Sequence, residues 1–307
     1  MKRVQAVKTP KLFIALCVVP AFSLMVYFLI WPALNVFLLS ITNVTSVGGF
    51  DPSKIVWEKN FVKMFTQDDR FLQALGNTGK LLLVTPIVTV FFSLLMAFSL
   101  SQSKLKERGF YRTAFFFPSI VNMVVVGIIW YYVFTPRSGI LNSLLNAVGL
   151  GGQGWLGQSD AAIWTIAVAM IWQAAGYYMV MHIAAIDGIS ADVFEAATID
   201  GAGPMRKMFS ITLPLIKNIV GITFIFAISG TLNNSWVLSD MMTSGGPNGA
   251  TTVLLQYVQK QGLGLGNRGY AMAIQAFVLV VSVLLSLLSQ RLTGGSERRE
   301  RRVAKNK

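Results

Sequence analysis

The polar stretch from Glu195 to Pro204 lies between two long apolar segments and has the residue types of a docking element. Before it, Ile186, Ile189 and Val193 recur at helical spacing, which predicts a short helix with one apolar face. This helix would present small alanines and a carboxylate. Such a surface could be gripped by a soluble partner, or the stretch could be a simple interfacial connector between the two segments.

The residues around this helix predict its two ends. Ser190 or Asp192 can cap its N-terminus. The sequence Asp200-Gly201-Ala202-Gly203 ends it, because glycine adopts the positive φ angles that a sharp reversal needs. Pro204 suits the start of a second short helix. We therefore expect a helix–turn–helix here.

The elements that position this stretch are membrane spans. The chain has 307 residues, of which 54% are hydrophobic and 13% charged, and its mean hydropathy is +0.59, too apolar for a soluble protein of this size. A span needs about 20 apolar residues. Six segments meet this requirement, so we predict an all-α integral membrane protein with a six-helix bundle. The predicted spans are about 12–34, 81–100, 113–134, 161–183, 213–238 and 271–289.

The basic residues predict the orientation of these spans. Most of the 26 lysines and arginines lie in the connections on the same side as Glu195, and this side is the cytoplasmic one by the positive-inside rule. Both termini are then cytoplasmic. The net charge of +13 is therefore read as a signal of membrane orientation, and no nucleic-acid partner is expected. The basic-rich segments are 1–11, 101–112, 184–217 and the tail from 291.

Other chemistry finds little support in the residues. His182 is the only histidine, and a structural role is favoured for it. Gly264–Gly269 has the spacing of a dinucleotide fingerprint but follows no predicted strand. There is no phosphate-binding loop of the Walker type. We expect no catalytic residue, no metal and no cofactor in this chain; a channel or secondary carrier stays an alternative to an ATP-driven transporter.

One motif resembles a known family. Glu195-Ala196-Ala197, with Gly201 six residues after Glu195 and Leu213-Pro214 further on, is similar to the EAA loop of permease subunits of binding-protein-dependent ABC importers. The stretches 60–78 and 243–252 resemble the carbohydrate and glycerol-phosphate branch, close to the maltose-transporter F-type or glycerol-phosphate A-type subunit. Ser190 stands where many relatives carry proline, which should soften the start of the coupling helix.

This resemblance implies a type I importer permease domain over residues 12–289, with an EAA coupling loop at 184–212, a cytoplasmic N-terminus at 1–11 and a basic tail at 290–307. It implies a second homologous permease subunit, two copies of a cytoplasmic ABC ATPase that carry ATP and magnesium, and an extracytoplasmic solute-binding protein. The bacterial or archaeal inner membrane is the expected location. The residues that would couple to the ATPase are Glu195, Ala196, Ala197, Asp200, Gly201 and Pro214.

Polar side chains within the spans are the candidates for the solute path, because an unpaired polar group in hydrocarbon is costly. Span five offers Ser229, Asn233 and Asn234, and the first two share a helix face. In maltose-type relatives this span lines the sugar site, and the resemblance also points to Tyr177. Gln173 lies one turn before Tyr177, and Asn122 in span three is a further candidate. Hydrogen bonds between helices are the alternative role for each.

The solute class follows from charge. A phosphate-bearing solute would be expected to attract Arg or Lys into the cavity, and the interior of the spans has neither, with Lys80 near an outer edge. We therefore expect a carbohydrate, with glycerol phosphate or a polyol as the alternatives.

Overall fold

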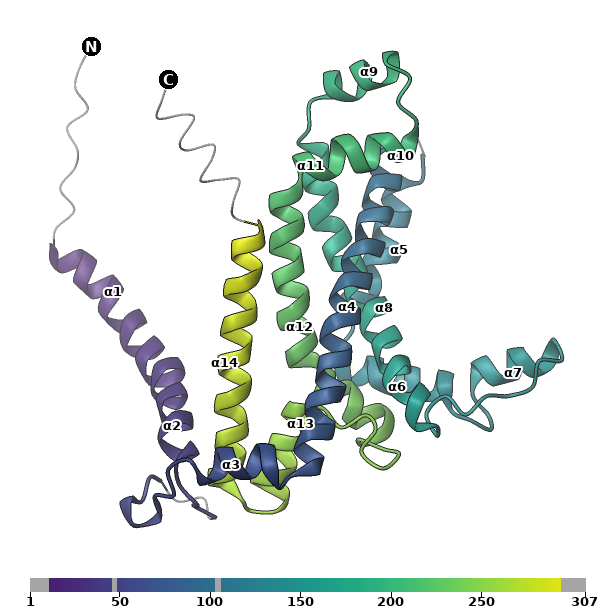
Figure 1. Ribbon diagram of the computed structural model, residues 1–307. Helices are drawn as coiled ribbons and strands as arrows, with labels where there is room; N and C mark the ends of the chain where they lie inside the picture. Colours follow the sequence, from purple (N-terminus) through teal and green to yellow (C-terminus); the bar gives the residue numbers. More distant parts are fainter. Residues whose placement is uncertain (1–10, 46–48, 103–105, 294–307) are drawn as a thin grey trace. The chain divides into compact units, whose positions relative to one another are not determined.

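Helices dominate the computed structural model, which describes residues 11–45, 49–102 and 106–293 (Figure 1). Within these ranges no strand forms, and one isolated antiparallel bridge joins Thr42 to Ile55. The predicted terminal segments 1–11 and 290–307 lie almost entirely outside the described residues. The helices are α1 (Lys11–Met25), α2 (Trp31–Ser40), α3 (Lys59–Thr66), α4 (Asp69–Gln102), α5 (Arg108–Ile120), α6 (Met123–Phe134), α7 (Ile140–Ala147), α8 (Ser159–Asp187), α9 (Ala191–Ile199), α10 (Pro204–Arg206), α11 (Leu213–Leu215), α12 (Lys217–Thr243), α13 (Leu254–Gln259) and α14 (Arg268–Thr293).

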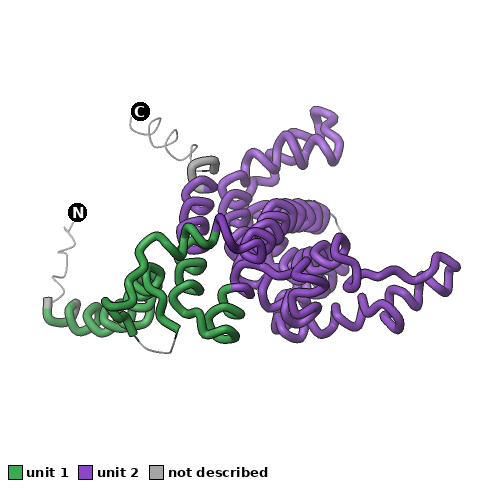
Figure 2. The backbone as a smooth tube through the Cα atoms, turned by 60° about the horizontal axis from the view of Figure 1, so that its bottom comes forward, with its two compact units in different colours: residues 1–64, 258–277 green, residues 65–257, 278–307 purple. Residues whose placement is uncertain are grey.

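The chain forms two compact units, which Figure 2 shows in different colours. The first contains residues 1–64 and 258–277, and the second contains residues 65–257 and 278–307. In the first unit the start of α14 is held against residues 42–44, since the Gly269 N–H donates to the Val44 carbonyl at 2.8 Å. The Asn60 side chain donates to the carbonyls of Ser40 and Thr42 at 2.8 Å each.

Among the described residues, five helices are long and apolar enough to cross a membrane, and the pair α5 and α6 makes a sixth if it is one broken span. The predicted all-α membrane fold is therefore confirmed. The observed helices extend beyond the apolar cores seen in the sequence. The second candidate span, for example, starts at Asp69 and has 33 residues, because polar residues at its ends continue the helix outside the apolar segment.

The third predicted span, 113–134, is not one straight helix. Its two halves, α5 and α6, are bent by 99° at residues 121 and 122. Pro118 removes one backbone donor near the end of α5. Asn122 then caps α6, and its Oδ1 accepts a hydrogen bond from the Val124 N–H at 2.9 Å. A proline followed by a capping asparagine is thus the local cause of the break.

The first predicted span, 12–34, is longer and irregular. It continues to Ser40, and a π-helical turn at Val26–Ile30 separates α1 from α2. Pro20 lies inside α1, and Pro32 lies in the first turn of α2, directly after the π-helical turn. None of the most apolar part of this segment is buried within the chain.

The second unit is built on α4, α8 and α12, which lie side by side, with α5 packed on α8 (Figure 1). Two apolar clusters fill it: one around Leu81, Ile166 and Leu238, the other around Val90 and Ile183. The first cluster lies nearer α7 and the second nearer α9. Each of the three long helices therefore contributes side chains to both clusters, and the clusters form two layers of the core.

Close contact between α5 and α8 depends on Gly176. A Cβ placed on this residue would collide with the backbone of Phe115 and Phe116. Backbone cannot move aside as a flexible side chain can, so only glycine allows this approach. Small residues at helix interfaces have this role in membrane proteins generally.

We predict that Gly176→Ala lowers the free energy of unfolding of the detergent-solubilised protein by about 1–3 kcal/mol, the usual cost of overpacking. Gly79 in α4 is the matched control, because nothing lies within 4 Å of its added Cβ. Gly79→Ala should leave stability unchanged or raise it by about 0.5–1 kcal/mol. Equal thermal or denaturant midpoints for the two variants would contradict the packing role of Gly176.

Candidate functional site

The loop at residues 184–212, which we call the Glu195 loop, has the predicted helix–turn–helix form. The Ser190 side chain caps α9 by accepting from the Asp192 N–H at 3.3 Å. The Gly201 N–H donates to the Thr198 carbonyl at 3.1 Å, and the Ala202 N–H donates to the Ala197 carbonyl at 2.9 Å. These two bonds form a Schellman motif. It requires a left-handed residue, and Gly201 supplies it with φ +73°.

The second half of the loop continues into α12. A three-residue helix, α10, passes into a π-helical turn at Lys207–Thr212 and then into α11. The Lys207 Nζ donates to the Thr198 Oγ1 at 2.7 Å, which ties this half back to α9. Hydrogen bonds therefore hold the turn after α9 and also join the second half of the loop to α9. It lies beyond one end of α8 and α12, and α7 extends from the other end of the second unit (Figure 1).

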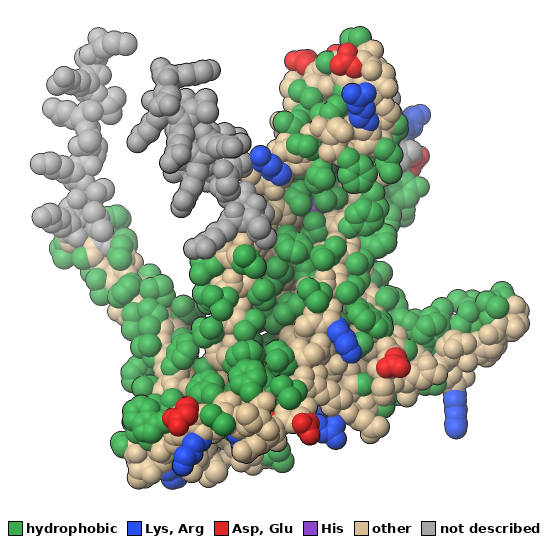
Figure 3. Space-filling model, in the orientation of Figure 1, with side chains coloured by type: hydrophobic (Ala, Val, Ile, Leu, Met, Phe, Trp, Pro, Cys, Tyr) green, Lys and Arg blue, Asp and Glu red, His purple; other side chains and the backbone are tan. Residues whose placement is uncertain are grey.

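Most of the predicted coupling residues are accessible. Glu195 and Ala196 are exposed on α9, and Asp200, Gly201 and Pro214 are exposed after it. In Figure 3 charged side chains are visible around α9, whereas the flanks of the bundle are mostly hydrophobic. Apolar side chains are exposed in the same loop, with Ile199 at 87% and Met205 at 67%. A surface of carboxylates beside free apolar side chains suits a protein partner better than water alone.

Ala197 differs from the other predicted coupling residues. It is only 6% exposed and packs against the rest of this chain. Its small side chain therefore serves the packing of α9 itself, whereas Ala196 is available to a partner.

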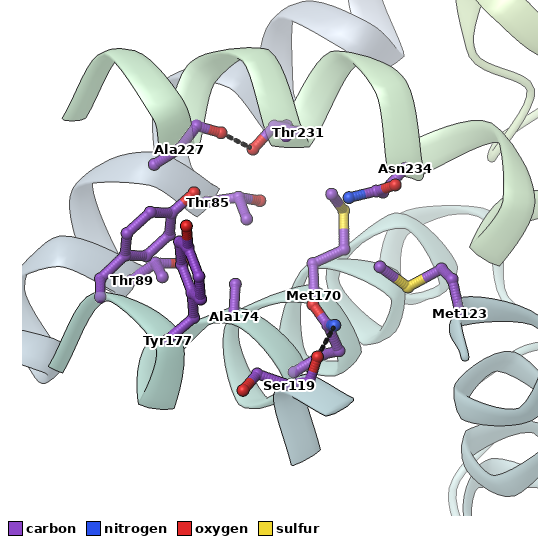
Figure 4. A pocket seen from close by; sticks show the side chains of 13 residues that line it. Thr85, Thr89, Ser119, Met123, Met170, Ala174, Tyr177, Ala227, Thr231 and Asn234 are labelled. Atoms are coloured by element: carbon purple, nitrogen blue, oxygen red, sulfur yellow. Dashed lines mark hydrogen bonds between the residues drawn. The ribbon is translucent and has the colours of Figure 1, made fainter. Parts of the chain in front are cut away.

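A cavity of about 180 Å³ lies within the second unit, between the two apolar clusters (Figure 4). Its lining residues come from α4, α5, α6, α8 and α12. None of its thirteen lining residues is charged. Its polar lining consists of hydroxyl and amide side chains, from Thr85, Thr89, Ser119, Gln173, Tyr177, Tyr178, Thr231 and Asn234.

Three of the predicted solute-path residues meet in this cavity. Gln173 and Tyr177 enter it from α8, and Asn234 enters it from α12. The Gln173 Nε2 lies 3.5 Å from the Ser119 carbonyl, a weak contact that leaves the amide free to bind elsewhere. The Tyr177 and Tyr178 rings meet edge to face, with centroids 5.4 Å apart. Tyr177 is 48% exposed, so its ring lies at the mouth of the cavity.

The other three predicted residues lie elsewhere. Asn233 is exposed on a different face of α12, since each helical residue turns by about 100° from its neighbour. Ser229 shares that face, as predicted, and lines a shallow hollow with Ser282 and Ser286 of α14. The Asn122 side chain caps α6 and does not line the cavity.

The polar cavity residues that were not predicted from the sequence include two threonines of α4. Thr85 and Thr89 of α4 are 3% and 1% exposed, and the Oγ1 of each has no hydrogen-bond partner. The available signal was their spacing, because positions i and i+4 share a helix face. A threonine in an apolar run commonly bonds to its own helix, so this spacing alone did not distinguish them.

His182 lies one turn beyond the cavity, towards the Glu195 loop. It is fully buried, and its ring nitrogens contact Ser93 Oγ at 3.1 Å and Thr223 Oγ1 at 2.9 Å. Each hydroxyl also lies within hydrogen-bond distance of a carbonyl of its own helix, Val90 at 2.8 Å for Ser93 and Val220 at 2.9 Å for Thr223. A neutral imidazole donates to one hydroxyl, and it accepts from the other when that hydroxyl turns its proton from the carbonyl to the ring. His182 therefore joins α8 to α4 and α12. This arrangement agrees with the structural role that the sequence favoured.

Comparison with known proteins gives matches over nearly the whole chain. A family model described as the inner membrane component of binding-protein-dependent transport systems matches residues 81–302. The chain is 37% identical to the diacetylchitobiose uptake system permease protein NgcF of Streptomyces coelicolor, over 85% of this chain and 78% of that protein. It is 31% identical to the sn-glycerol-3-phosphate transport system permease protein UgpA of Salmonella choleraesuis, over 90% and 91% respectively.

A solved structure has the same fold. It is a chain of a bacterial alginate ABC transporter in complex with an alginate pentasaccharide-bound periplasmic protein, with a TM-score of 0.79 and 22% identity over 92% of this chain and 93% of that chain. Since the family model covers well over half of the sequence, the chain belongs to the inner membrane components of binding-protein-dependent transport systems. The family inferred from the Glu195 motif is thereby confirmed.

We predict that His182→Leu lowers the free energy of unfolding in mixed micelles by about 1–2 kcal/mol, because hydrogen bonds between membrane helices contribute about 0.6 kcal/mol each and the ring also fills space. A double-mutant cycle isolates the contact. Ser93→Ala should cost stability in the original protein and almost nothing in the His182→Leu background. Fully additive losses would show that the two residues do not interact.

Proposed function

Because the chain belongs to this family, we propose that it is one of two permease subunits of an ABC importer that carries a neutral carbohydrate into the cell. The single observation that supports this solute class best is the cavity, which is lined by hydroxyl, amide and aromatic side chains and by no charged residue. Sugar hydroxyls both donate and accept hydrogen bonds, and the same is true of this lining. The relative NgcF, a diacetylchitobiose permease by name, is consistent with a sugar.

In this proposal the Glu195 loop is cytoplasmic and docks into a separate ATPase, which carries ATP and magnesium. Glu195 would pair with a basic residue of the ATPase, and Ala196 would allow its close approach. Gly201 adopts the left-handed conformation that the turn after α9 needs. A displacement of α9 would then be transmitted to both α8 and α12. The exposure of Glu195 and the bracing of the loop support this assignment.

The complete importer would contain a second homologous permease subunit, two ATPase copies and an extracytoplasmic solute-binding protein. The alginate transporter bound to its periplasmic protein supports the last of these. Glycerol phosphate is the alternative solute, since UgpA is also a relative. The uncharged lining of the cavity favours the sugar, because a phosphate needs cationic partners.

We expect Glu195→Lys and Gly201→Asp to leave membrane insertion intact but to uncouple ATP hydrolysis from uptake in vesicles that contain all subunits. Reversing one charge of a docked pair costs at least about 2–5 kcal/mol, and an aspartate at Gly201 must adopt a left-handed conformation. Glu107→Lys, an exposed acid outside the loop, is the control and should transport normally. Normal uptake by both loop variants would refute the coupling role.

The solute class can be tested on the reconstituted complex. We expect neutral oligosaccharides, presented by the binding protein, to stimulate ATP hydrolysis, and glycerol phosphate to give no stimulation. The reverse order would favour the alternative solute. Uptake without any ATPase would instead favour a secondary carrier or channel.

A further inference from the structure

We propose that Thr85 and Thr89 form a hydrogen-bonding subsite for one ring of the sugar as it passes through the cavity. This inference rests on the proposed import of a carbohydrate. Both residues lie on α4, one turn apart on the same face, and both line the cavity. Their side chains are almost completely buried, yet neither hydroxyl has a partner.

Other buried threonines of the same helices behave differently. Thr78 donates its hydroxyl to the Ala74 carbonyl, Thr165 to the Ala162 carbonyl and Thr231 to the Ala227 carbonyl, at 2.7–2.8 Å. This bond to the preceding turn is the usual way to satisfy a threonine inside a helix. Thr85 and Thr89 leave it unmade, so their hydroxyls stay available to a molecule in the cavity.

An unpaired buried hydroxyl destabilises the protein and calls for an explanation. A ligand that brings its own hydroxyls would remove this cost on entering. The opposite wall of the cavity fits such a ligand, because the Asn234 amide lies across from the two threonines and Tyr177 (Figure 4). An aromatic face and a few polar groups are typical of small-molecule sites.

The size of the cavity limits what it holds. A drug-sized ligand occupies a pocket of about 300–1,000 Å³, whereas this cavity measures about 180 Å³. It therefore suits a single sugar ring, or one ring of a longer chain. It is also larger than the about 30 Å³ share of one water molecule. Several waters are thus the competing occupants, and the experiment must separate them from a sugar.

The test uses the complete importer in proteoliposomes with saturating loaded binding protein. Valine has the shape of threonine without the hydroxyl, so Thr85→Val and Thr89→Val remove only the proposed contacts. We expect each to slow uptake by about 3- to 10-fold, the value of one neutral hydrogen bond, with no fall in melting temperature. Thr85→Ser and Thr89→Ser keep the hydroxyl and should retain uptake.

The control is Thr165→Val, which removes a buried hydroxyl outside the cavity. It should lower the melting temperature and leave the uptake rate of the assembled complex unchanged. A purely structural role predicts that Thr85→Val and Thr89→Val are at least as stable as the original protein and equally active. That result, with normal uptake by the original protein, overturns the subsite and leaves the proposed function intact.

A series of deoxy sugars makes the assignment specific. A sugar that lacks the contacted hydroxyl should be taken up more slowly by the original protein, and no further loss should follow in the matching valine variant. Equal sensitivity of the original and valine proteins to every deoxy position would instead show that only water occupies the site. If the original complex imports no sugar at all, the proposed function itself fails.

Discussion

A polar group inside a bilayer has to find its hydrogen-bond partner within the protein, and the second unit is organised by this constraint. Its helices satisfy their own backbone, and His182 satisfies its ring on hydroxyls from two neighbouring helices. The constraint is left unmet at Thr85 and Thr89, where the two apolar clusters are separated by the cavity. These two unpartnered hydroxyls thus lie where a polar solute could be accommodated.

The cavity and the Glu195 loop are connected through the same helices. α8 runs from Tyr177 past His182 to the loop, and α12 returns from the loop to Asn234. The Schellman turn at Gly201 and the Lys207 bond make the loop a braced connection between these helices. α9 is joined to α8 through residues 188–190 and to α12 through residues 200–216, so a displacement of α9 by a partner would act on both helices that line the cavity.

Sequence reasoning succeeded where local rules decide the outcome. The ends of α9 follow from Ser190 and Gly201, whose capping and left-handed roles involve only neighbouring residues. It did less well where rotation about a helix axis matters. Asn233 was the favoured candidate of span five in the sequence, yet Asn234 lines the cavity in its place, because packing against α4 and α8 sets which face of α12 turns inward. The break at Asn122 also went unforeseen, since its apolar flanks read as one span.

The sequence by itself determined the class of molecule: apolar length gives the spans, and the residues from Glu195 to Pro214 give the loop, whose motif resembles that of the family. These are properties of consecutive residues, and water and lipid act on them directly. The tertiary structure alone decided the cavity, the tie at His182 and the free hydroxyls of Thr85 and Thr89. Each of these depends on which helix faces meet, and that depends on the summed packing of residues distant in the chain.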